Sequence, residues 1–153
     1  MQIREPDDAE SAQIGRELLL PFFREEESLD PEFNRLDVGD DPDADHWLDH
    51  PERGLFVATI DGELVGVITL GRSASPPIYE RGAVAHLEGL YVKPEFRRQG
   101  IGTALLERAE AWASANQCDH LKTLVHADNE AADSLYRTAF SLKYRSYWRS
   151  MDG

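Results

Sequence analysis

Two arginines and two glycines lie close together where a predicted strand gives way to a predicted helix. Arg97 and Arg98 come just before Gly100 and Gly102. Glycine lets the backbone approach a ligand closely and adopt positive φ, and the first N–H groups of a helix have no partners within it. Those groups also carry the positive end of the helix dipole. This segment is therefore expected to bind an anion such as a pyrophosphate.

The glycine pattern differs from those of two common nucleotide sites. The segment has no Gly-Lys-Ser/Thr run of a P-loop, and Leu105 stands where a dinucleotide-binding turn needs its third glycine. ATP and NAD are therefore disfavoured as ligands. A nucleotide-binding regulatory domain is an alternative that rests on this turn alone, and stabilisation of the fold by ATP would support it.

Polar side chains also interrupt the predicted strand at 83–92. Its alternation places Val84, His86, Glu88, Leu90 and Val92 on one face, because successive side chains of a strand point to opposite sides. An imidazole or a carboxylate on such a face can accept a proton from a substrate. His86 and Glu88 are both candidate bases, and the sequence does not choose between them.

Hydrophobic periodicity and turn residues predict the elements that position these groups. Asp7 and Glu10 have capping-box spacing for a first helix, which should end near Pro21, and Asp61-Gly62 is a strong hairpin signal. The expected elements are strands at 2–4, 54–60, 63–70, 83–92, 121–125 and 140–151, and helices up to Pro21, at 45–50, at 101–116 and from Asp128 or Asn129 to 139. This β-α-α-β-β-β-α-β-α-β order predicts an α/β fold whose mixed sheet has helices on both faces.

The region between residues 25 and 52 contains twelve acidic residues and a single basic one, Arg35. Three prolines interrupt it, so only short helices such as 45–50 are expected there. The acidity of Asp40, Asp41, Asp43 and Asp45 has two interpretations. It attracts a cationic substrate, or it belongs to a solvated acidic surface of the kind found in proteins of salt-loving organisms.

Length and composition limit the classes of function. The chain has 153 residues, the size of one domain, and a net charge of −13, which argues against binding to nucleic acid or anionic membranes. No run of about 20 apolar residues and no signal peptide is visible, so a cytoplasmic protein is expected. Cys118 is the single cysteine and has no neighbours at metal-ligand spacing, so no metal site is expected.

The strand, the glycine turn and the helix, followed by the run Asn-Glu-Ala-Ala-Asp-Ser-Leu-Tyr at 129–136, resemble the GNAT superfamily of N-acetyltransferases. The specific motifs lie between residues 83 and 140, whereas the N-terminal third matches in outline only. The family usually has Gly-Phe after its tyrosine helix, and this chain has Ala139-Phe140 instead. The resemblance implies a GNAT-like, mainly antiparallel sheet in one domain spanning 1–153.

The resemblance also implies where acetyl-CoA, as cosubstrate, should bind. The family's pyrophosphate turn falls on Arg97, Arg98, Gln99, Gly100, Ile101, Gly102 and Thr103. By the same comparison the main chain of Leu90, Tyr91 and Val92 pairs with the pantetheine arm, and Asn129 contacts that arm.

Catalysis is expected to use Tyr136, which matches the family's general acid and whose phenol can protonate the departing thiolate. Glu88 or His86 would act as the base, and a backbone N–H near Leu90 would stabilise the oxyanion. The function implied is acetyl transfer from acetyl-CoA to an amine of unknown identity, a small molecule or a peptide. The alternative is a non-catalytic module that binds or senses acyl-CoA, and a homodimer is the commonest assembly to expect.

Overall fold

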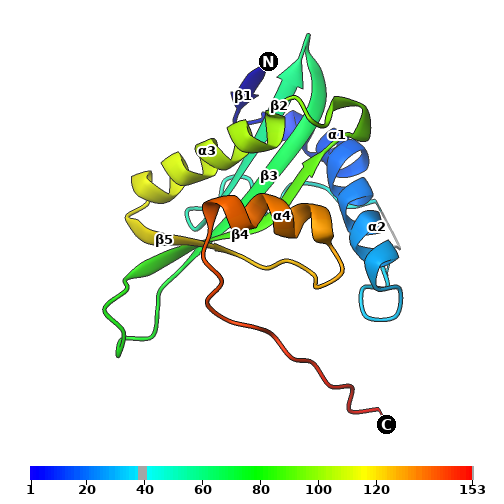
Figure 1. Ribbon diagram of the computed structural model, residues 1–153. Helices are drawn as coiled ribbons and strands as arrows, with labels where there is room; N and C mark the ends of the chain where they lie inside the picture. Colours follow the sequence, from blue (N-terminus) through cyan, green and yellow to red (C-terminus); the bar gives the residue numbers. More distant parts are fainter. Residues whose placement is uncertain (38–40, 153) are drawn as a thin grey trace.

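A computed structural model describes residues 1–37 and 41–152. It shows an α/β fold in which helices cover both faces of a five-stranded sheet (Figure 1). The strands lie in the order β1-β2-β3-β4-β5, and all neighbours are antiparallel except β4 and β5, which are parallel. The strands are β1 (Gln2–Arg4), β2 (Arg53–Ile60), β3 (Glu63–Ser73), β4 (Ala83–Val92) and β5 (Cys118–Thr123).

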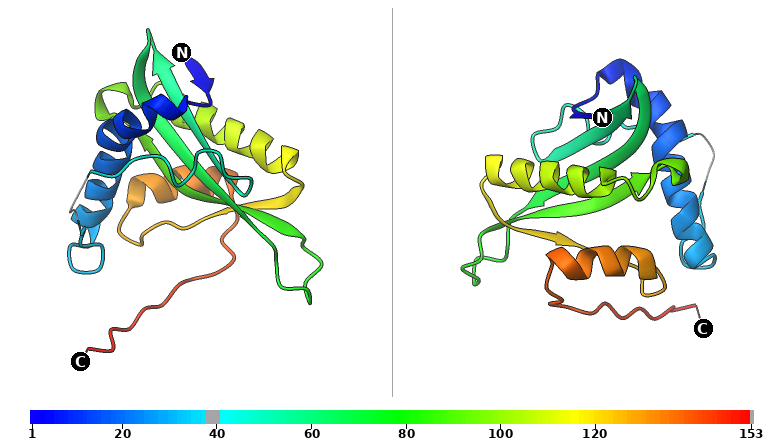
Figure 2. Two further views of the ribbon diagram at one scale, coloured as in Figure 1. Left: turned by 180° about the vertical axis from the view of Figure 1, so that it is seen from behind. Right: turned by 45° about the horizontal axis from the view of Figure 1, so that its top comes forward.

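Helices lie on both faces of the sheet (Figure 2). One hydrophobic cluster on each face holds them to the strands. Alternation along β2 separates the two clusters, because Phe56 and Ala58 belong to one cluster while Leu55 and Val57 belong to the other. The first cluster packs under α3 and α4, and the second packs under α1 and α2. These helices are α1 (Ser11–Ile14), α2 (Leu20–Leu29), α3 (Ile101–Ala115) and α4 (Glu130–Ala139), with 3-10 turns η1 (Asp8–Glu10) and η3 (Pro94–Phe96).

The predicted hairpin is confirmed. Asp61 and Gly62 both have positive φ, 50° and 82°, and connect β2 to β3 with Ile60 opposite Glu63. Positive φ at both central residues matches the right-handed twist of the flanking strands, which is why this dipeptide predicts hairpins well.

The first helix begins as predicted but ends later than predicted. The Glu10 carboxylate accepts the Asp7 N–H at 2.9 Å, which caps the start. The helix then passes Pro21 and ends at Leu29 instead of stopping near Pro21. A wider π-helical turn, η2 (Gly15–Leu19), lies immediately before the proline. Such a turn relieves the crowding that a proline ring causes against the preceding turn, so the helix continues.

The acidic connection after α2 contains no helix among its described residues, so the helix predicted at 45–50 is wrong, and the chain forms turns there. The segment packs closely over the first helix, because Ala44 is fully buried and its N–H bonds to Ser11. Asp45 accepts a hydrogen bond from the Ser11 hydroxyl, so one acidic side chain of this stretch has a structural role. Asp40 lies outside the described residues.

The last strand predicted, at 140–151, is absent from the described residues. The chain is extended after α4 but makes no ladder, and it leads away from the sheet (Figure 1). An alternating sequence provides strand propensity, whereas a strand also needs a partner edge to hydrogen-bond with. Large apolar side chains are therefore exposed along this tail: Leu142, Tyr144, Tyr147, Trp148 and Met151. Separately, none of the helices in the described ranges is long and apolar enough to cross a membrane.

Candidate active site

An extra residue interrupts the pairing of β4 at Glu88. Thr69 and Leu70 are adjacent on β3, yet their partners on β4 are Gly89 and Leu87, which leaves Glu88 without a partner. Such a β-bulge bends the strand and changes the direction of the side chains around it. The bulge places Glu88 at the centre of the candidate site.

The bulge corrects one prediction about this strand. We expected His86, Glu88 and Leu90 on the same face, but only the first two share it. A Cβ built on Gly71, the partner of His86, would lie 2.7 Å from the Glu88 carboxylate, so Glu88 projects on the face of His86. Leu87 and Leu90 both pack into the cluster under α3. The inserted residue therefore reverses the alternation, and Leu90 and Val92 lie on the opposite face.

The bulge also marks the point where β4 and β5 part. Their pairing ends at Leu87 and Thr123, whose hydroxyl donates to the Leu87 carbonyl at 3.2 Å. Further along, Lys93 N–H donates to Val65 O at 2.9 Å, on the β3 side. Because antiparallel strands alternate between bonded and non-bonded pairs, the N–H and C=O of Leu90 then point away from β3, toward the gap. Leu90 thus offers a backbone donor and acceptor that no described residue bonds to.

The gap between the strands forms a cleft of about 80 Å³. It is lined by Phe22, Glu26, Leu87, Glu88, Gly89, Leu90, Thr123, Leu124, Val125, His126, Asn129, Ala132 and Tyr136. The structure therefore brings four of the predicted site residues together, Glu88, Leu90, Asn129 and Tyr136. Phe22, Glu26 and His126 were not predicted. The first two lie on the part of the helix beyond Pro21, which the proline concealed from sequence reasoning.

Tyr136 projects into this cleft from α4. Its side chain is 9% exposed and packs edge-to-face on Phe140, with ring centroids 5.5 Å apart. Burial raises the pKa of Tyr136 to about 12, and the nearby Thr123 side chain opposes this shift. The phenol therefore keeps its proton at neutral pH and can donate it.

Asn129 has a structural role at the start of α4. Its side-chain oxygen accepts the Ala132 N–H at 3.1 Å, as an N-cap does. At the other end of the helix, Phe140 has an extended backbone with φ −126°. Ala139 is the last helical residue and is not among the described residues with positive φ, so an alanine in place of the family's glycine causes no strain.

The predicted anion turn lies outside the cleft lining, at the N-terminus of α3. Gly100 has φ 82° and Arg98 has φ 65°. A Cβ on Gly100 or Gly102 would meet nothing within 4 Å, so protein packing does not explain the second glycine. The first bond closing the helix runs from Ala104 N–H to Gly100 O, which leaves the preceding amides free for an anion.

Arg97 anchors this turn to the sheet and to α2. Its guanidinium donates to the Val92 carbonyl at 2.7 Å and pairs with Glu25 at 2.7 Å. The Val92 carbonyl is therefore already bonded, unlike the backbone of Leu90.

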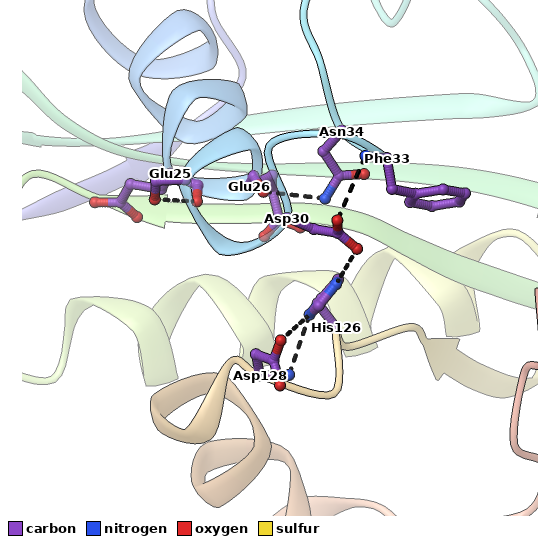
Figure 3. A network of polar contacts seen from close by, with 8 residues as sticks. Glu25, Glu26, Asp30, Phe33, Asn34, His126 and Asp128 are labelled. Atoms are coloured by element: carbon purple, nitrogen blue, oxygen red, sulfur yellow. Dashed lines mark hydrogen bonds and ion pairs between the residues drawn. The ribbon is translucent and has the colours of Figure 1, made fainter.

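A polar network closes the cleft between α2 and the loop after β5 (Figure 3). His126 Nε2 lies 3.0 Å from the Asp30 carboxylate, and the Asn34 amide donates to the Glu26 carbonyl at 3.0 Å. The hydrogen bond to His126 is the main cause that lowers the pKa of Asp30, whereas burial raises the pKa of Glu26. These contacts hold the C-terminal half of α2 beside the cleft.

A second hollow, of about 240 Å³, lies on the other side of Glu88. It is lined by His50, Glu52, Arg53, Gly71, Arg72, Ser73, His86 and Glu88. Burial is the first cause that lowers the pKa of His86, and the charge of Lys122 acts in the same direction while Glu88 opposes it. Glu88 lines both cavities, so a group bound in either one can reach it.

Among the residues that the structure describes, no group of three or more histidine, cysteine or acidic side chains is arranged to hold a metal ion. The donors available at this site are backbone amides, a phenol, an imidazole and carboxylates. Such a set suits proton transfer and the binding of anionic and amine groups.

Comparisons with known proteins give the family of the chain and its relatives. The sequence profile of the acetyltransferase (GNAT) family matches residues 16–140. Over 90 residues, or 58% of this chain, the sequence is 38% identical to an aminoglycoside N(6′)-acetyltransferase type 1 of Klebsiella aerogenes, and it is 34% identical over 94 residues to an acetyltransferase of Sodalis glossinidius. The matches span 59% and 61% of those relatives' own length.

Solved structures show the same fold at low sequence identity. A variant of a Bacillus halodurans protein superimposes with a TM-score of 0.84 at 16% identity, covering 99% of this chain and 100% of the other. An aminoglycoside N-acetyltransferase in complex with CoA superimposes with a TM-score of 0.69 at 17% identity, again over 99% and 100% of the chains.

Proposed function

We propose that this chain, which belongs to the acetyltransferase (GNAT) family, transfers an acetyl group from acetyl-CoA directly to an amine. One observation carries the proposal. The pairing of β4 with β5 ends next to Glu88, where Leu90, Asn129 and Tyr136 meet in one cleft. The names of the relatives, an aminoglycoside N(6′)-acetyltransferase and an acetyltransferase, support the same activity.

The residues fit acetyl-CoA in two places. The free amides opening α3, beside Gly100 and Gly102, suit the pyrophosphate, because they combine unpaired donors with the positive end of the helix dipole. The free C=O of Leu90 suits an amide N–H of the pantetheine arm, which can pair with a strand edge as a further strand does. When bound, this cosubstrate supplies an activated acyl group.

Side chains of this protein then carry out the proton transfers. Formation of the C–N bond requires a neutral amine, so Glu88 or His86 removes its proton, directly or through water. Both face the second hollow, from which the amine enters. The Leu90 N–H donates to the developing oxyanion, and the Tyr136 hydroxyl delivers a proton to sulfur as the C–S bond breaks.

A non-catalytic acyl-CoA-binding module is the alternative. It would need the same cleft but no proton donor at the thioester. The protonated phenol of Tyr136 inside the cleft and the carboxylate of Glu88 between the two cavities favour catalysis. Binding of acetyl-CoA without thiol release across a broad panel of amines, at low and at high salt, would support the module.

A charge placed at the α3 N-terminus tests the cosubstrate site. Gly102→Glu adds a carboxylate where a Cβ meets open space, and a glutamate in the first turn suits a helix. We expect calorimetry to show at least about tenfold weaker acetyl-CoA binding, because the carboxylate repels the pyrophosphate. Ala111→Glu, on the exposed side of the same helix, adds the same charge and should bind normally. Equal affinity in both variants, or no binding heat in the unmodified protein, would contradict the proposal.

The tail provides support for a further proposal, that the protein forms a homodimer. Tyr147 and Trp148 are 87% and 76% exposed on an extended segment without a partner strand. Exposed apolar side chains gathered on one segment are typical of a surface that another chain covers. Sedimentation equilibrium should give twice the 17.3 kDa of one chain, and a single-chain mass would contradict it.

A further inference from the structure

The second hollow lies beside a row of side chains that crosses four strands. Arg53 on β2 pairs with Gly71 on β3, Gly71 pairs with His86 on β4, and His86 pairs with Lys122 on β5. Directly paired residues project from the same face of a sheet, so these four positions are side by side. Gly71 has no side chain, which leaves a shallow floor between the basic groups.

Within the described part of the chain, the cations at the two ends of this row have no acidic partner. Arg53 donates to the His46 carbonyl at 3.1 Å, and no carboxylate of the described residues lies within ion-pair distance of either Arg53 or Lys122. Arg72, also in the hollow, pairs with Glu52 at 3.4 Å. Unpaired cations are notable here because the chain as a whole carries a net charge of −13. They provide a place for an anionic group.

Glu88 supplies the opposite charge in the same hollow. Its carboxylate lies over Gly71, where an added Cβ would approach it to 2.7 Å, and it makes no ion pair with a described residue. The hollow therefore has a carboxylate beside the cleft and the guanidinium of Arg53 in its lining, while Lys122 ends the same row of side chains outside the lining. A ligand with one amine and one carboxylate complements this arrangement, since each of its charges meets the opposite charge.

We propose that the acceptor is a small zwitterion, an amine that also carries a carboxylate, such as an amino acid. Its amine lies at Glu88 and its carboxylate lies at Arg53, whose guanidinium can bind a carboxylate with two hydrogen bonds, while Lys122 adds charge attraction. This inference rests on the proposed acetyl transfer and narrows its substrate class. A polycationic acceptor would meet the guanidinium of Arg53 in the hollow and the charge of Lys122 near it. The volume of about 240 Å³ is also small beside the roughly 300–1,000 Å³ of pockets for drug-sized ligands.

Matched acceptors test the charge preference. Thiol release from acetyl-CoA is measured with a panel of amino acids, with the same compounds as primary amides, and with a polyamine. The amide keeps the amine and the side chain but removes the negative charge. We expect kcat/KM to be at least about tenfold higher for the best amino acid than for its amide, as one lost charge-assisted pair predicts.

Variants of the cations assign the effect to this hollow. Arg53→Gln should lower kcat/KM for the amino acid at least about tenfold and leave the amide unchanged, because only the carboxylate contacts the guanidinium. Lys122→Gln should act in the same direction but more weakly, since a more distant exposed charge is screened by solvent. Arg24→Gln is the matched control, because this exposed arginine on α2 has no role in either cavity. Its loss should leave kcat/KM unchanged for both the amino acid and its amide.

The outcomes separate this inference from the proposed function. Faster acetylation of the amide or of the polyamine would contradict a zwitterionic acceptor but not acetyl transfer. The same holds if Arg53→Gln lowers kcat/KM equally for the amino acid and for its amide. If no amine is acetylated although calorimetry shows acetyl-CoA binding, both proposals fail and the acyl-CoA-binding module is favoured. Circular dichroism of each variant excludes unfolding as the cause of a loss.

Discussion

The two halves of β4 differ in how many neighbours they have. Before the bulge, residues 84–87 pair with β3 on one side and with β5 on the other. After it, β4 pairs only with β3, and its free side forms the wall of the cleft. One half is therefore part of the packed sheet, while the other offers backbone donors to a ligand.

This difference shows how a sheet can provide both a core and a binding site with the same strand. A buried backbone group that lacks a partner is costly, so an unpaired strand edge persists where water or a ligand can bond to it. The bulge at Glu88 is the single residue that separates the half of β4 paired on both sides from the half paired on one side. It follows that substitutions near the paired half should affect stability, and substitutions near the free half should affect the rate.

The largest expected effect is on stability, beside the paired half. Leu70 is fully buried opposite Leu87, and Leu70→Ala should lower the free energy of unfolding by about 2–5 kcal/mol, because it leaves a cavity in the core. Urea denaturation measures this change. Leu142→Ala on the exposed tail should change stability by less than about 0.5 kcal/mol. If Leu70→Ala were as stable as the parent and yet inactive, the division between the two halves would be wrong.

The next effect concerns the free half and the rate. Tyr136→Phe should lower kcat about 100-fold, because the thiolate then departs without a general acid. The pKa of Tyr136, raised to about 12, keeps the phenol protonated. The ratio of the parent kcat to the Tyr136→Phe kcat should therefore stay constant between pH 7 and pH 10. Tyr144→Phe, in the exposed tail, is the matched control and should keep its full rate. A fully active Tyr136→Phe enzyme would remove the general acid from the mechanism.

The smallest effect concerns the bulge itself. Gly71→Ala places a methyl group 2.7 Å from the Glu88 carboxylate, which can swing away because it ends a flexible side chain. We expect kcat/KM to fall by a factor of about three to ten while stability changes by less than about 1 kcal/mol, since alanine also restricts the unfolded chain.

A double-mutant cycle identifies the cause of that loss. If displacement of Glu88 is responsible, Gly71→Ala should have no further effect in a Glu88→Gln background. Additive losses in the double variant would mean that Glu88 does not mediate the effect, and His86 would become the favoured base.

Local chemistry made several features predictable. Asp61-Gly62 specified its hairpin because few other residue pairs accept two positive φ angles. The helix after Gly100 was predicted by its apolar spacing, and the structure ends it at Ala115. The family resemblance then indicated Tyr136 and Leu90, which the structure places in one cleft. Each of these signals lies within a few residues of the feature that it predicts.

Other features depend on contacts between distant segments. The bulge at Glu88 is a mismatch in the pairing of β3 with β4. The alternation of β4 alone therefore predicted a single face for Glu88 and Leu90, which lie on opposite faces. The helix continued past Pro21 because packing against the sheet and a wide turn outweighed the proline's local cost. The tail at 140–151 has strand-forming residues, yet among the described residues it forms no ladder with the open edge of β5.

By itself, then, the sequence determined the glycine turn before α3, the hairpin, the helix after Gly100 and the acidic character of the chain, because each is encoded by neighbouring residues. Only the tertiary structure decided which face Glu88 shares with His86, which side chains complete the cleft, and that Arg53 and Lys122 form the ends of one row. Register, strand separation and unpaired charge are properties of segments far apart in the sequence, and they exist only once those segments pack together.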